Sequence, residues 1–288
     1  MTVVVQELYG VFKLRIGFAI ALSAVAGLAV TPGPDIAAWR VVVLALAVLL
    51  SAASAGAFNQ FIERDLDARM ARTRNRPFVT GRYTAGPLWL GIIVGLLVAA
   101  VLLAAWATNA FAALHVFLGA VVYGVVYTVW LKRRTWMNIV IGGLSGSFAV
   151  LAGAAAVDPH LSAIPICLAL VLFLWTPPHF WSLAMGLRDD YAEAEVPMLP
   201  LVVGDARAAW VILGHTVALV ALSVVPFFYG LGYIYLAAAL VGGGMFLEKS
   251  IALVRAPGRE AAMANFRASL MQLSLVLIGA MADAWLPL

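Results

Sequence analysis

The sequence predicts an all-α, polytopic membrane protein whose nine transmembrane helices form one domain over residues 1–288. Of the 288 residues, 64% are hydrophobic and only 11% are charged, and the mean hydropathy is +1.01. Such a small polar fraction cannot cover the core of a water-soluble domain. The apolar runs are also long enough to cross a hydrocarbon layer of about 30 Å. These observations exclude a soluble globular protein.

Nine apolar segments follow one another along the chain, and each predicts one transmembrane helix. They cover residues 14–30, 37–58, 86–106, 109–130, 138–156, 162–185, 207–229, 231–247 and 268–286. The prolines and glycine of Thr31–Asp35 predict a turn between the first two helices. The junctions at 107–108 and at 230 are so short that they predict tight antiparallel hairpins.

Lysine and arginine are distributed very unevenly between the two sides of this predicted topology. Successive loops of a multi-span protein lie on alternate sides of the membrane. With the loops and ends assigned in this way, seventeen lysine and arginine residues fall on one side and only Arg40 falls on the other. The positive-inside rule therefore places the N-terminus in the cytoplasm and the C-terminus on the outer face. The net charge of +4 lies in short loops between spans, so it does not indicate nucleic-acid binding.

The most charged stretch, residues 59–77, comes directly after the second apolar segment and reads NQFIERDLDARMARTRNRP. Asn59, Glu63 and Asp67 are spaced four residues apart, so on one continuous helix they fall within an arc of about 80°. Carboxylates at this spacing repel each other unless a cation lies between them, and Mg²⁺ prefers oxygen ligands. The stripe predicts a metal site, although a solvated charge cluster at a membrane end remains the alternative. Asp65 falls off the stripe, and we expect it to pair with Arg69.

A second acidic stretch follows the sixth apolar segment, as the first follows the second. It carries Asp189, Asp190, Glu193 and Glu195, of which the last two fit a solvated loop equally well. Prolines at 197 and 200 prevent a continuous helix there. The four-helix interval suggests a diverged internal repeat, and we expect loops 59–85 and 186–206 to face each other over a shared cavity.

Two further motifs lie at the same predicted side. Lys132 and Arg133 could neutralise phosphate oxygens, although residues that only anchor the topology would look the same. The segment Trp175–Trp181, WTPPHFW, predicts a break in its helix, because proline removes backbone donors and irregular backbone is tolerated where it lines a cavity. His179 is a candidate ligand or proton donor, or else an interfacial histidine held by a backbone carbonyl. His115 and His215 lie in apolar spans and are expected to face the bundle interior.

Together these motifs resemble the UbiA superfamily of intramembrane prenyltransferases and, within it, the protohaem IX farnesyltransferase (haem O synthase) subfamily. The superfamily motif Asn-x-x-x-Asp-x-x-x-Asp matches Asn59, Glu63 and Asp67. The subfamily blocks match Asp65, Met70, Arg72, Thr73, Arg76 and Pro77, then residues 131–143, 175–181 and 190–200. The chain departs from the pattern at three places. Glu63 replaces an aspartate, Leu14 replaces the proline usual between Lys13 and Arg15, and Ala194 stands four residues after Asp190.

The resemblance implies a UbiA-type bundle around a central cavity. It implies transfer of the farnesyl group of farnesyl diphosphate to a vinyl group of haem b, with addition of water, giving haem O for haem–copper oxidase assembly. It implies Mg²⁺ as cofactor, held by Asn59, Glu63, Asp67 and Asp190. The expected catalytic residues are Asn59, Asp67, Arg76, Lys132 and Arg133, and the expected substrate-binding residues are Lys13, Arg15, Arg72, Trp175, His179 and Tyr191.

The resemblance also implies a location in the bacterial cytoplasmic (inner) membrane, in contact with lipid, with haem A synthase or oxidase assembly proteins as further partners. Two alternatives stay open at this point. A UbiA-type enzyme acting on an aromatic quinone precursor would keep the chemistry and change the acceptor. An ion-coupled transporter would instead place carboxylates in the middle of spans, whereas here they lie in loops or at helix ends.

Overall fold

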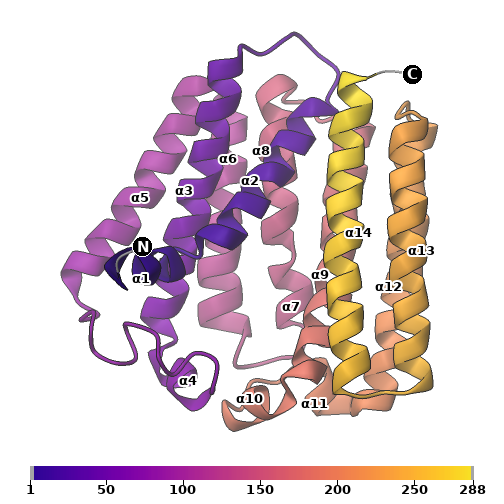
Figure 1. The fold of residues 1–288 in the computed structure, drawn as a ribbon. Helices are drawn as coiled ribbons and strands as arrows, with labels where there is room; N and C mark the ends of the chain where they lie inside the picture. Colours follow the sequence, from indigo (N-terminus) through magenta and orange to yellow (C-terminus); the bar gives the residue numbers. More distant parts are fainter. Residues whose placement is uncertain (1–2, 287–288) are drawn as a thin grey trace.

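The computed structural model describes residues 3–286, and within that range the regular structure is entirely helical (Figure 1). The first half supplies α1 (Val3–Val11), α2 (Leu14–Ala29), α3 (Ala38–Ile62), α4 (Arg64–Arg69), α5 (Pro87–Ala107), α6 (Ala110–Val121) and the π-helix η1 (Val122–Leu131). The second half supplies α7 (Asn138–Gly142), α8 (Leu144–Val157), α9 (Ala163–Gly186), α10 (Arg188–Glu193), α11 (Leu199–Val203), α12 (Asp205–Phe228), α13 (Tyr233–Arg255) and α14 (Arg259–Trp285).

The predicted multi-span membrane fold is confirmed. Within residues 3–286, eight helices are long and apolar enough to cross a bilayer, counting α6 with η1 and α7 with α8 as single spans. A ninth span requires taking α1 and α2 together, and this pair is bent by 48°. The predicted hairpins are also confirmed, since only residues 108–109 separate α5 from α6 and residues 229–232 separate α12 from α13.

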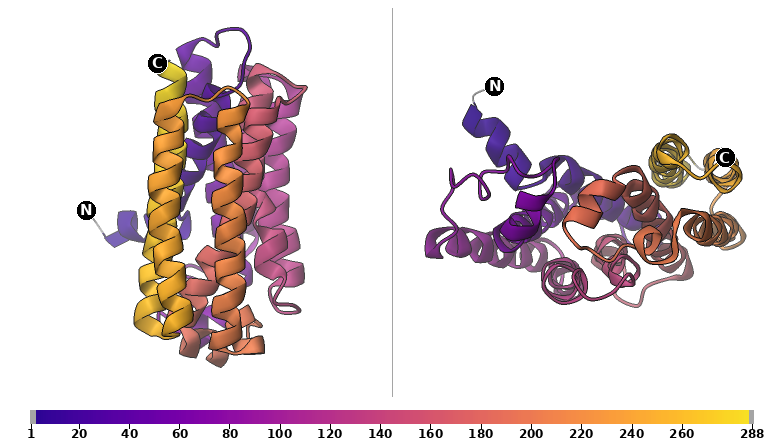
Figure 2. Two further views of the ribbon diagram at one scale, coloured as in Figure 1. Left: turned by 90° about the vertical axis from the view of Figure 1, so that its right-hand side faces the viewer. Right: turned by 90° about the horizontal axis from the view of Figure 1, so that it is seen from below.

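The short helices α4, α10 and α11 lie together at one end of the bundle, while the last turn of α14 lies at the other end (Figure 1). Helix α1 projects sideways from the bundle (Figure 2). In the middle, α2 and α8 approach closely because glycines face backbone at the crossing. A side chain at Gly27 would overlap the backbone of Val150, and one at Gly153 would overlap that of Ala24. Small residues permit such contacts between membrane helices.

Several predicted helix boundaries were wrong. The expected loop 248–267 is mostly helical, because α13 continues to Arg255 and α14 already begins at Arg259. Hydropathy marks only the apolar part of a helix, and both of these helices continue into more polar residues of good helix propensity. Pro257 and Gly258 then form the short turn between them.

Two local predictions also fail. Helix α9 continues through Pro177 and Pro178, so the predicted break does not occur. In a membrane bundle, neighbouring helices and side chains can stabilise a helix that contains proline, and the hydroxyl of Thr176, just before the prolines, bonds to the carbonyl of Leu172. Conversely, the helix expected to run through Asn59 and Asp67 is interrupted at Glu63, whose φ of −91° and ψ of 20° separate α3 from α4.

Candidate active site

The three polar side chains of the predicted stripe are buried at the end of the bundle where α4 lies. Asn59, Glu63 and Asp67 expose only 2%, 1% and 3% of their surface. Each is matched by one basic side chain. Lys13 Nζ donates to Asn59 Oδ1 at 2.6 Å, Lys132 Nζ donates to Glu63 Oε2 at 2.5 Å, and Arg76 Nη1 donates to both Asp67 oxygens at 2.8 and 2.7 Å. These six residues are called the polar cluster below.

The bases of the polar cluster come from three separate parts of the chain. Lys13 occupies the bend between α1 and α2 with a left-handed backbone (φ 47°, ψ 41°). Arg76 lies in the loop after α4, and Lys132 directly follows η1. The fold thus brings together residues that are 46 to 69 positions apart, as in the Lys13–Asn59 and Lys132–Glu63 contacts. Predicted residues Asn59, Glu63, Asp67, Lys13, Arg76 and Lys132 are therefore assembled in one place.

Two further site residues were missed by the sequence analysis. Tyr123 accepts a hydrogen bond from Lys13 Nζ at 2.9 Å, and Thr128 Oγ1 accepts one from Asn59 Nδ2 at 3.1 Å. Both lie in the apolar segment 109–130, where hydroxyl groups at the end of a span were the available signal. They are five residues apart on η1, and Thr128 Oγ1 donates to the Tyr123 carbonyl at 2.9 Å.

The π-helical winding of η1 matters for this placement. Backbone bonding between residues five apart continues to the end of the element, where Lys132 N donates to the carbonyl of Tyr127 at 2.9 Å. Tyr127 also lies beneath the Lys132 ammonium, 5.7 Å from its ring centre. Single π-turns are frequent at functional sites because they redirect side chains without ending a helix. Here the wider turn carries Tyr123, Tyr127 and Thr128 toward the polar cluster.

The chemistry of the polar cluster fits a hard divalent cation in one respect. Glu63 Oε1 is enclosed and has no hydrogen-bond partner, so one carboxylate oxygen remains free for a ligand. Mg²⁺ takes carboxylate and amide oxygens together with substrate phosphate. However, no three His, Cys, Asp or Glu side chains converge within residues 3–286 as a metal-binding group. The places beside the oxygens are taken by lysine and arginine.

Asp190, the fourth predicted metal ligand, has a different role in the structure. Its Oδ1 accepts a hydrogen bond from Ala71 N at 2.9 Å, and its Oδ2 lies 3.7 Å from Arg72 Nε. Arg72 also donates to the hydroxyl of the buried Tyr191 at 3.2 Å. Asp190, Arg72 and Tyr191 therefore fasten the loop after α4 to α10. The two predicted loops do lie together, but here they touch directly.

The expected Asp65–Arg69 pair was wrong. Asp65 instead forms a bidentate ion pair with Arg133, whose Nη1 and Nη2 donate to the two carboxylate oxygens at 2.6 and 2.7 Å. Arg69 pairs with Glu195 at 3.3 Å. The interruption of the helix at Glu63 turns Asp65 toward the loop after η1. The hydrogen bonds from Arg133 hold the pKa of the Asp65 carboxyl below its usual range. Arg133 therefore lies at a half-exposed rim, with 43% of its side chain accessible, and not inside the polar cluster.

The remaining predicted residues are distributed as follows. Arg15 is exposed and forms no hydrogen bond or ion pair with any residue between 3 and 286. His115 and His215 are half-buried, and each bonds to the carbonyl four residues earlier in its own helix, so the bundle interior supplies neither with a polar partner.

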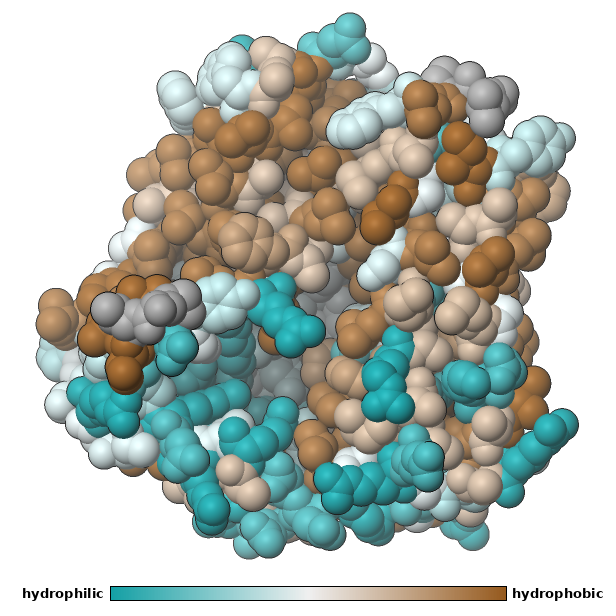
Figure 3. All heavy atoms as spheres, in the orientation of Figure 1, coloured by the Kyte–Doolittle hydropathy of each residue, from teal (hydrophilic) through white to brown (hydrophobic). Residues whose placement is uncertain are grey.

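The surface is hollowed between α1–α2 and α14, and hydrophilic side chains gather around the hollow (Figure 3).

His179 and Trp175 belong to an aromatic layer on α9. The ring of His179 stacks between Trp175 and Phe266, with ring centres 4.1 and 4.5 Å away. Its Nδ1 lies 2.7 Å from Ser269 Oγ on α14. His179 is buried, with 6% of its surface exposed, so it is not an interfacial histidine held by a backbone carbonyl.

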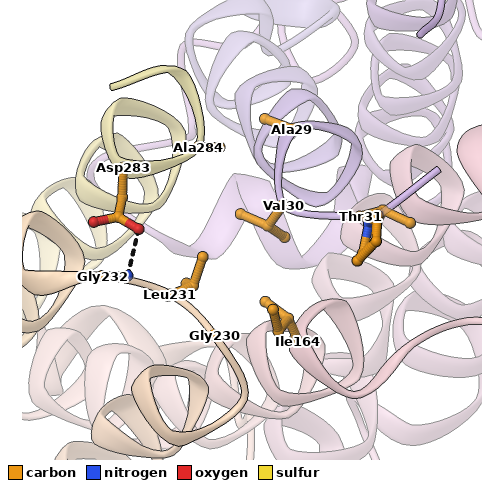
Figure 4. A pocket seen from close by; sticks show the side chains of 10 residues that line it. Ala29, Val30, Thr31, Ile164, Gly230, Leu231, Gly232, Asp283 and Ala284 are labelled. Atoms are coloured by element: carbon orange, nitrogen blue, oxygen red, sulfur yellow. Dashed lines mark hydrogen bonds between the residues drawn. The ribbon is translucent and has the colours of Figure 1, made fainter. Parts of the chain in front are cut away.

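A pocket lies at the end of the bundle opposite to the polar cluster, and its wall includes Thr31, Ile164, Leu231 and Asp283 (Figure 4). The two oxygens of Asp283 accept hydrogen bonds from the backbone N–H groups of Gly232 at 2.5 Å and Tyr235 at 3.3 Å. Asp283 thereby satisfies backbone donors at the start of α13. This arrangement stabilises a helix end, and it offers no group for catalysis.

Comparison with known proteins connects this architecture to one family. The UbiA prenyltransferase family matches residues 20–276. A relative named protohaem IX farnesyltransferase 2, from Paramagnetospirillum magneticum, is 63% identical over 285 residues, which covers 98% of both chains.

Two solved structures share the fold. A digeranylgeranylglyceryl phosphate synthase superposes with a TM-score of 0.80 at 16% identity, covering 97% of this chain and 98% of the other. A UbiA homologue from Archaeoglobus fulgidus, bound to DMAPP and Mg²⁺, superposes with a TM-score of 0.72 at 15% identity, covering 94% and 99%.

Proposed function

Because the chain belongs to the UbiA prenyltransferase family and groups with protohaem IX farnesyltransferases, we propose that it transfers the farnesyl group of farnesyl diphosphate to haem b. The C–O bond to diphosphate breaks, and the farnesyl carbon bonds to the terminal carbon of a haem vinyl group. Water adds to the other vinyl carbon and releases one proton, so the products are haem O and diphosphate. The observation that supports this chemistry best is the buried polar cluster.

Lys13, Arg76 and Lys132 are the residues that would receive the diphosphate. Each of these bases contacts one oxygen-bearing partner at hydrogen-bond distance in the polar cluster. Exchanging that partner for a phosphate oxygen keeps the base paired and stabilises the negative charge that develops on the leaving group. Arg72 and Arg133, at the rim, would add positive charge on the approach to the cluster.

Mg²⁺ would be held by Asn59, Glu63 and Asp67, and Asp190 would join them from the opposite loop only after releasing the N–H group of Ala71 and the side chain of Arg72. The free, enclosed Oε1 of Glu63 supports this assignment. When bound, the ion would neutralise diphosphate charge and assist its departure. The A. fulgidus homologue, which binds DMAPP and Mg²⁺, supports a metal-dependent site in this fold.

The apolar body of the bundle suits the farnesyl chain, which carries no polar group. The reaction passes through a cationic allylic carbon, and aromatic faces attract cations. Tyr123 and Tyr127 already lie beneath the ammonium groups of Lys13 and Lys132, with ring centres 5.4 and 5.7 Å away. The same faces would stabilise positive charge on the prenyl carbon while the protein excludes water.

The polar cluster would face the cytoplasm, with the N-terminus on that side and the C-terminus on the outer face of the bacterial inner membrane. The lysine and arginine distribution along the chain supports this orientation. Residues 1–288 would act as one membrane domain. Haem A synthase or oxidase assembly proteins, which would use haem O, are the partners we propose.

The test is to incubate membranes containing the protein with haem b, farnesyl diphosphate and Mg²⁺, and to detect haem O by mass. Membranes carrying the Asp67→Asn variant at equal protein level serve as the control. Formation of haem O only with the unaltered protein supports the proposal. Prenylation of an aromatic quinone precursor without any haem O would contradict it.

A further inference from the structure

His179 is held by contacts that fix both the plane and the rotation of its ring. The interplanar angles of the imidazole to Trp175 and Phe266 are 21° and 29°, so it stacks against both aromatic rings. Ser269 holds this stack through two separate contacts. Its carbonyl accepts the indole N–H of Trp175 at 2.7 Å, while its hydroxyl oxygen lies 2.7 Å from His179 Nδ1.

The hydrogen bonds of Ser269 determine which ring nitrogen of His179 carries the proton. The hydroxyl of Ser269 donates its only hydrogen to the carbonyl of Phe266 at 2.7 Å. Both short contacts of this oxygen are hydrogen bonds only when it accepts from His179, which places a hydrogen on Nδ1. In the neutral imidazole Nε2 then holds a lone pair. Nε2 has no hydrogen-bond partner among residues 3–286. Trp181 Nε1 is also unpaired but is fully enclosed by protein, whereas His179 Nε2 is not fully enclosed.

This pattern is the one that proteins use to prepare a histidine for a metal. A ligating histidine almost always donates its second ring N–H to an oxygen acceptor, which fixes the tautomer and the ring orientation. A role as proton donor does not fit, because the free nitrogen carries no hydrogen. Among the substrates of the proposed reaction, only haem b contains a metal ion.

We propose that His179 Nε2 coordinates the iron of the haem substrate, and that Ser269 is the positioning residue that sets the tautomer and orientation of the ring. This inference rests on the proposed function, because it takes haem b as the acceptor. An axial bond to iron holds the porphyrin at a fixed distance from α9. It would thereby limit which vinyl group can reach the prenyl carbon.

The experiment uses the purified full-length protein in detergent, titrated with ferric haem b in the absence of farnesyl diphosphate. Iron-free protoporphyrin IX is the parallel probe. We expect the unaltered protein to give the absorption and electron paramagnetic resonance spectra of an imidazole-ligated haem. His179→Ala should lose that signature, and added imidazole should restore it. Binding of iron-free protoporphyrin, measured by quenching of tryptophan fluorescence, should be the same in both proteins.

Ser269→Ala tests the positioning role separately. It should weaken haem b binding by about 10- to 100-fold, the usual loss when the partner of a ligating histidine is removed, without weakening protoporphyrin binding. Ser250→Ala is the matched control, because Ser250 is equally buried on α13 but bonds to Asn265 and Thr216. It should leave both affinities unchanged.

The outcomes separate this inference from the proposed function. If the protein makes haem O but His179→Ala retains an imidazole-ligated spectrum, the coordination proposal is overturned and the function stands. If Ser269→Ala binds haem b as tightly as Ser250→Ala does, the positioning role is overturned. If the unaltered protein forms no haem O and binds no haem b, the proposed function and this inference both fail.

Discussion

We expect Asp67 to be needed for farnesyl transfer, although it does not belong to the apolar core. It is buried and receives two hydrogen bonds from Arg76, so its negative charge is compensated within the polar cluster. Breaking a buried pair by removing one partner is costly, because the other charge is left unpaired. Replacing the carboxylate with an isosteric amide is therefore a gentler test than truncation.

Asp67→Asn should reduce farnesyl transfer by about 10²-fold or more, the loss typical when one electrostatic contact to a reacting group is removed. Haem O produced per unit of membrane-inserted protein is the measurement. Asn59→Ala should behave similarly, because Asn59 belongs to the same cluster. Asp189→Asn is the control, since Asp189 is exposed on α10. Turnover near that of the control in both cluster variants would remove these two residues from the metal site.

Asp65 should respond differently, because its side chain is 55% exposed and pairs with Arg133 at the rim. Asp65→Asn should lower transfer less than Asp67→Asn does. The Arg133 hydrogen bonds keep the pKa of Asp65 below its usual range. The pair therefore contributes stability above the ordinary aspartate pKa of about 3.9, and this contribution disappears as the pH falls through the lowered folded-state pKa.

The corresponding measurement is the unfolding midpoint of the unaltered protein and of Asp65→Asn across the acidic range. The difference between them should be constant above pH of about 5 and should shrink below pH of about 4. A difference that grows on acidification would show that the carboxyl is not stabilised in its charged form.

At the scale of elements, η1 connects the apolar bundle to the polar cluster. Thr128 is buried and accepts the amide N–H of Asn59, and that contact fixes which end of the amide faces Lys13. An α-helical continuation of α6 would rotate these side chains differently, because its hydrogen bonds span four residues and not five. The π-helix is therefore part of the site's construction.

Thr128→Val should test this role, because valine keeps the shape and removes the hydroxyl. Leaving the Asn59 amide unpaired should cost about 1–3 kcal/mol. If this whole cost is added to the activation free energy, the rate of transfer falls by roughly 5- to 150-fold. Thr128→Ser, which retains the hydroxyl, should stay close to the unaltered rate. Equal activity of the two variants would show that Thr128 does not orient Asn59.

The elements also indicate where sequence reasoning succeeds. Long apolar runs located the spans and the two short hairpins, because hydrophobic length is a local property of the chain. Spacing identified Asn59, Glu63 and Asp67, but it could not reveal the interruption at Glu63, which changes the direction of Asp65. The pairing of residues in the polar cluster depends on how distant segments pack together. Lys132 and Glu63, for example, are 69 residues apart in the sequence. No local pattern encodes such contacts.

The prolines of α9 give the complementary case. Pro177 and Pro178 predict a break when only the backbone is considered, yet the helix continues through them. In a bundle, neighbouring helices and side-chain hydroxyls stabilise backbone that would be broken in isolation. His179 follows directly after these prolines, and its partners Phe266 and Ser269 come from α14, about 90 residues away.

For the whole molecule, the two loops at one end act as a single unit. Ala71 N bonds to Asp190, and Arg69 pairs with Glu195, so the end of α4 and the segment after it are joined to α10 and the residues that follow it. In the polar cluster, Lys13 is paired with Asn59, Arg76 with Asp67, and Lys132 with Glu63. A ligand that enters must therefore replace contacts that already exist.

This arrangement predicts a cooperative requirement for two ligands. Diphosphate alone would draw the bases away and leave Glu63 and Asp67 buried without compensation, while Mg²⁺ alone would compete with the bases for the same oxygens. Together, diphosphate pairs with the bases and Mg²⁺ with the carboxylates, so every charged group is satisfied. A ligand set that binds only the folded protein raises its unfolding temperature by mass action.

Inorganic diphosphate and Mg²⁺ should therefore raise the thermal unfolding midpoint of the purified protein together far more than the sum of their separate effects. Mn²⁺ should replace Mg²⁺, because both ions prefer oxygen ligands in octahedral geometry. Chelation should abolish both the shift and farnesyl transfer. Asp67→Asn should lose the joint shift while Asp189→Asn retains it. If diphosphate gave the full shift in the presence of excess chelator, the bases alone would bind it, and the carboxylates would serve only to hold those bases in place.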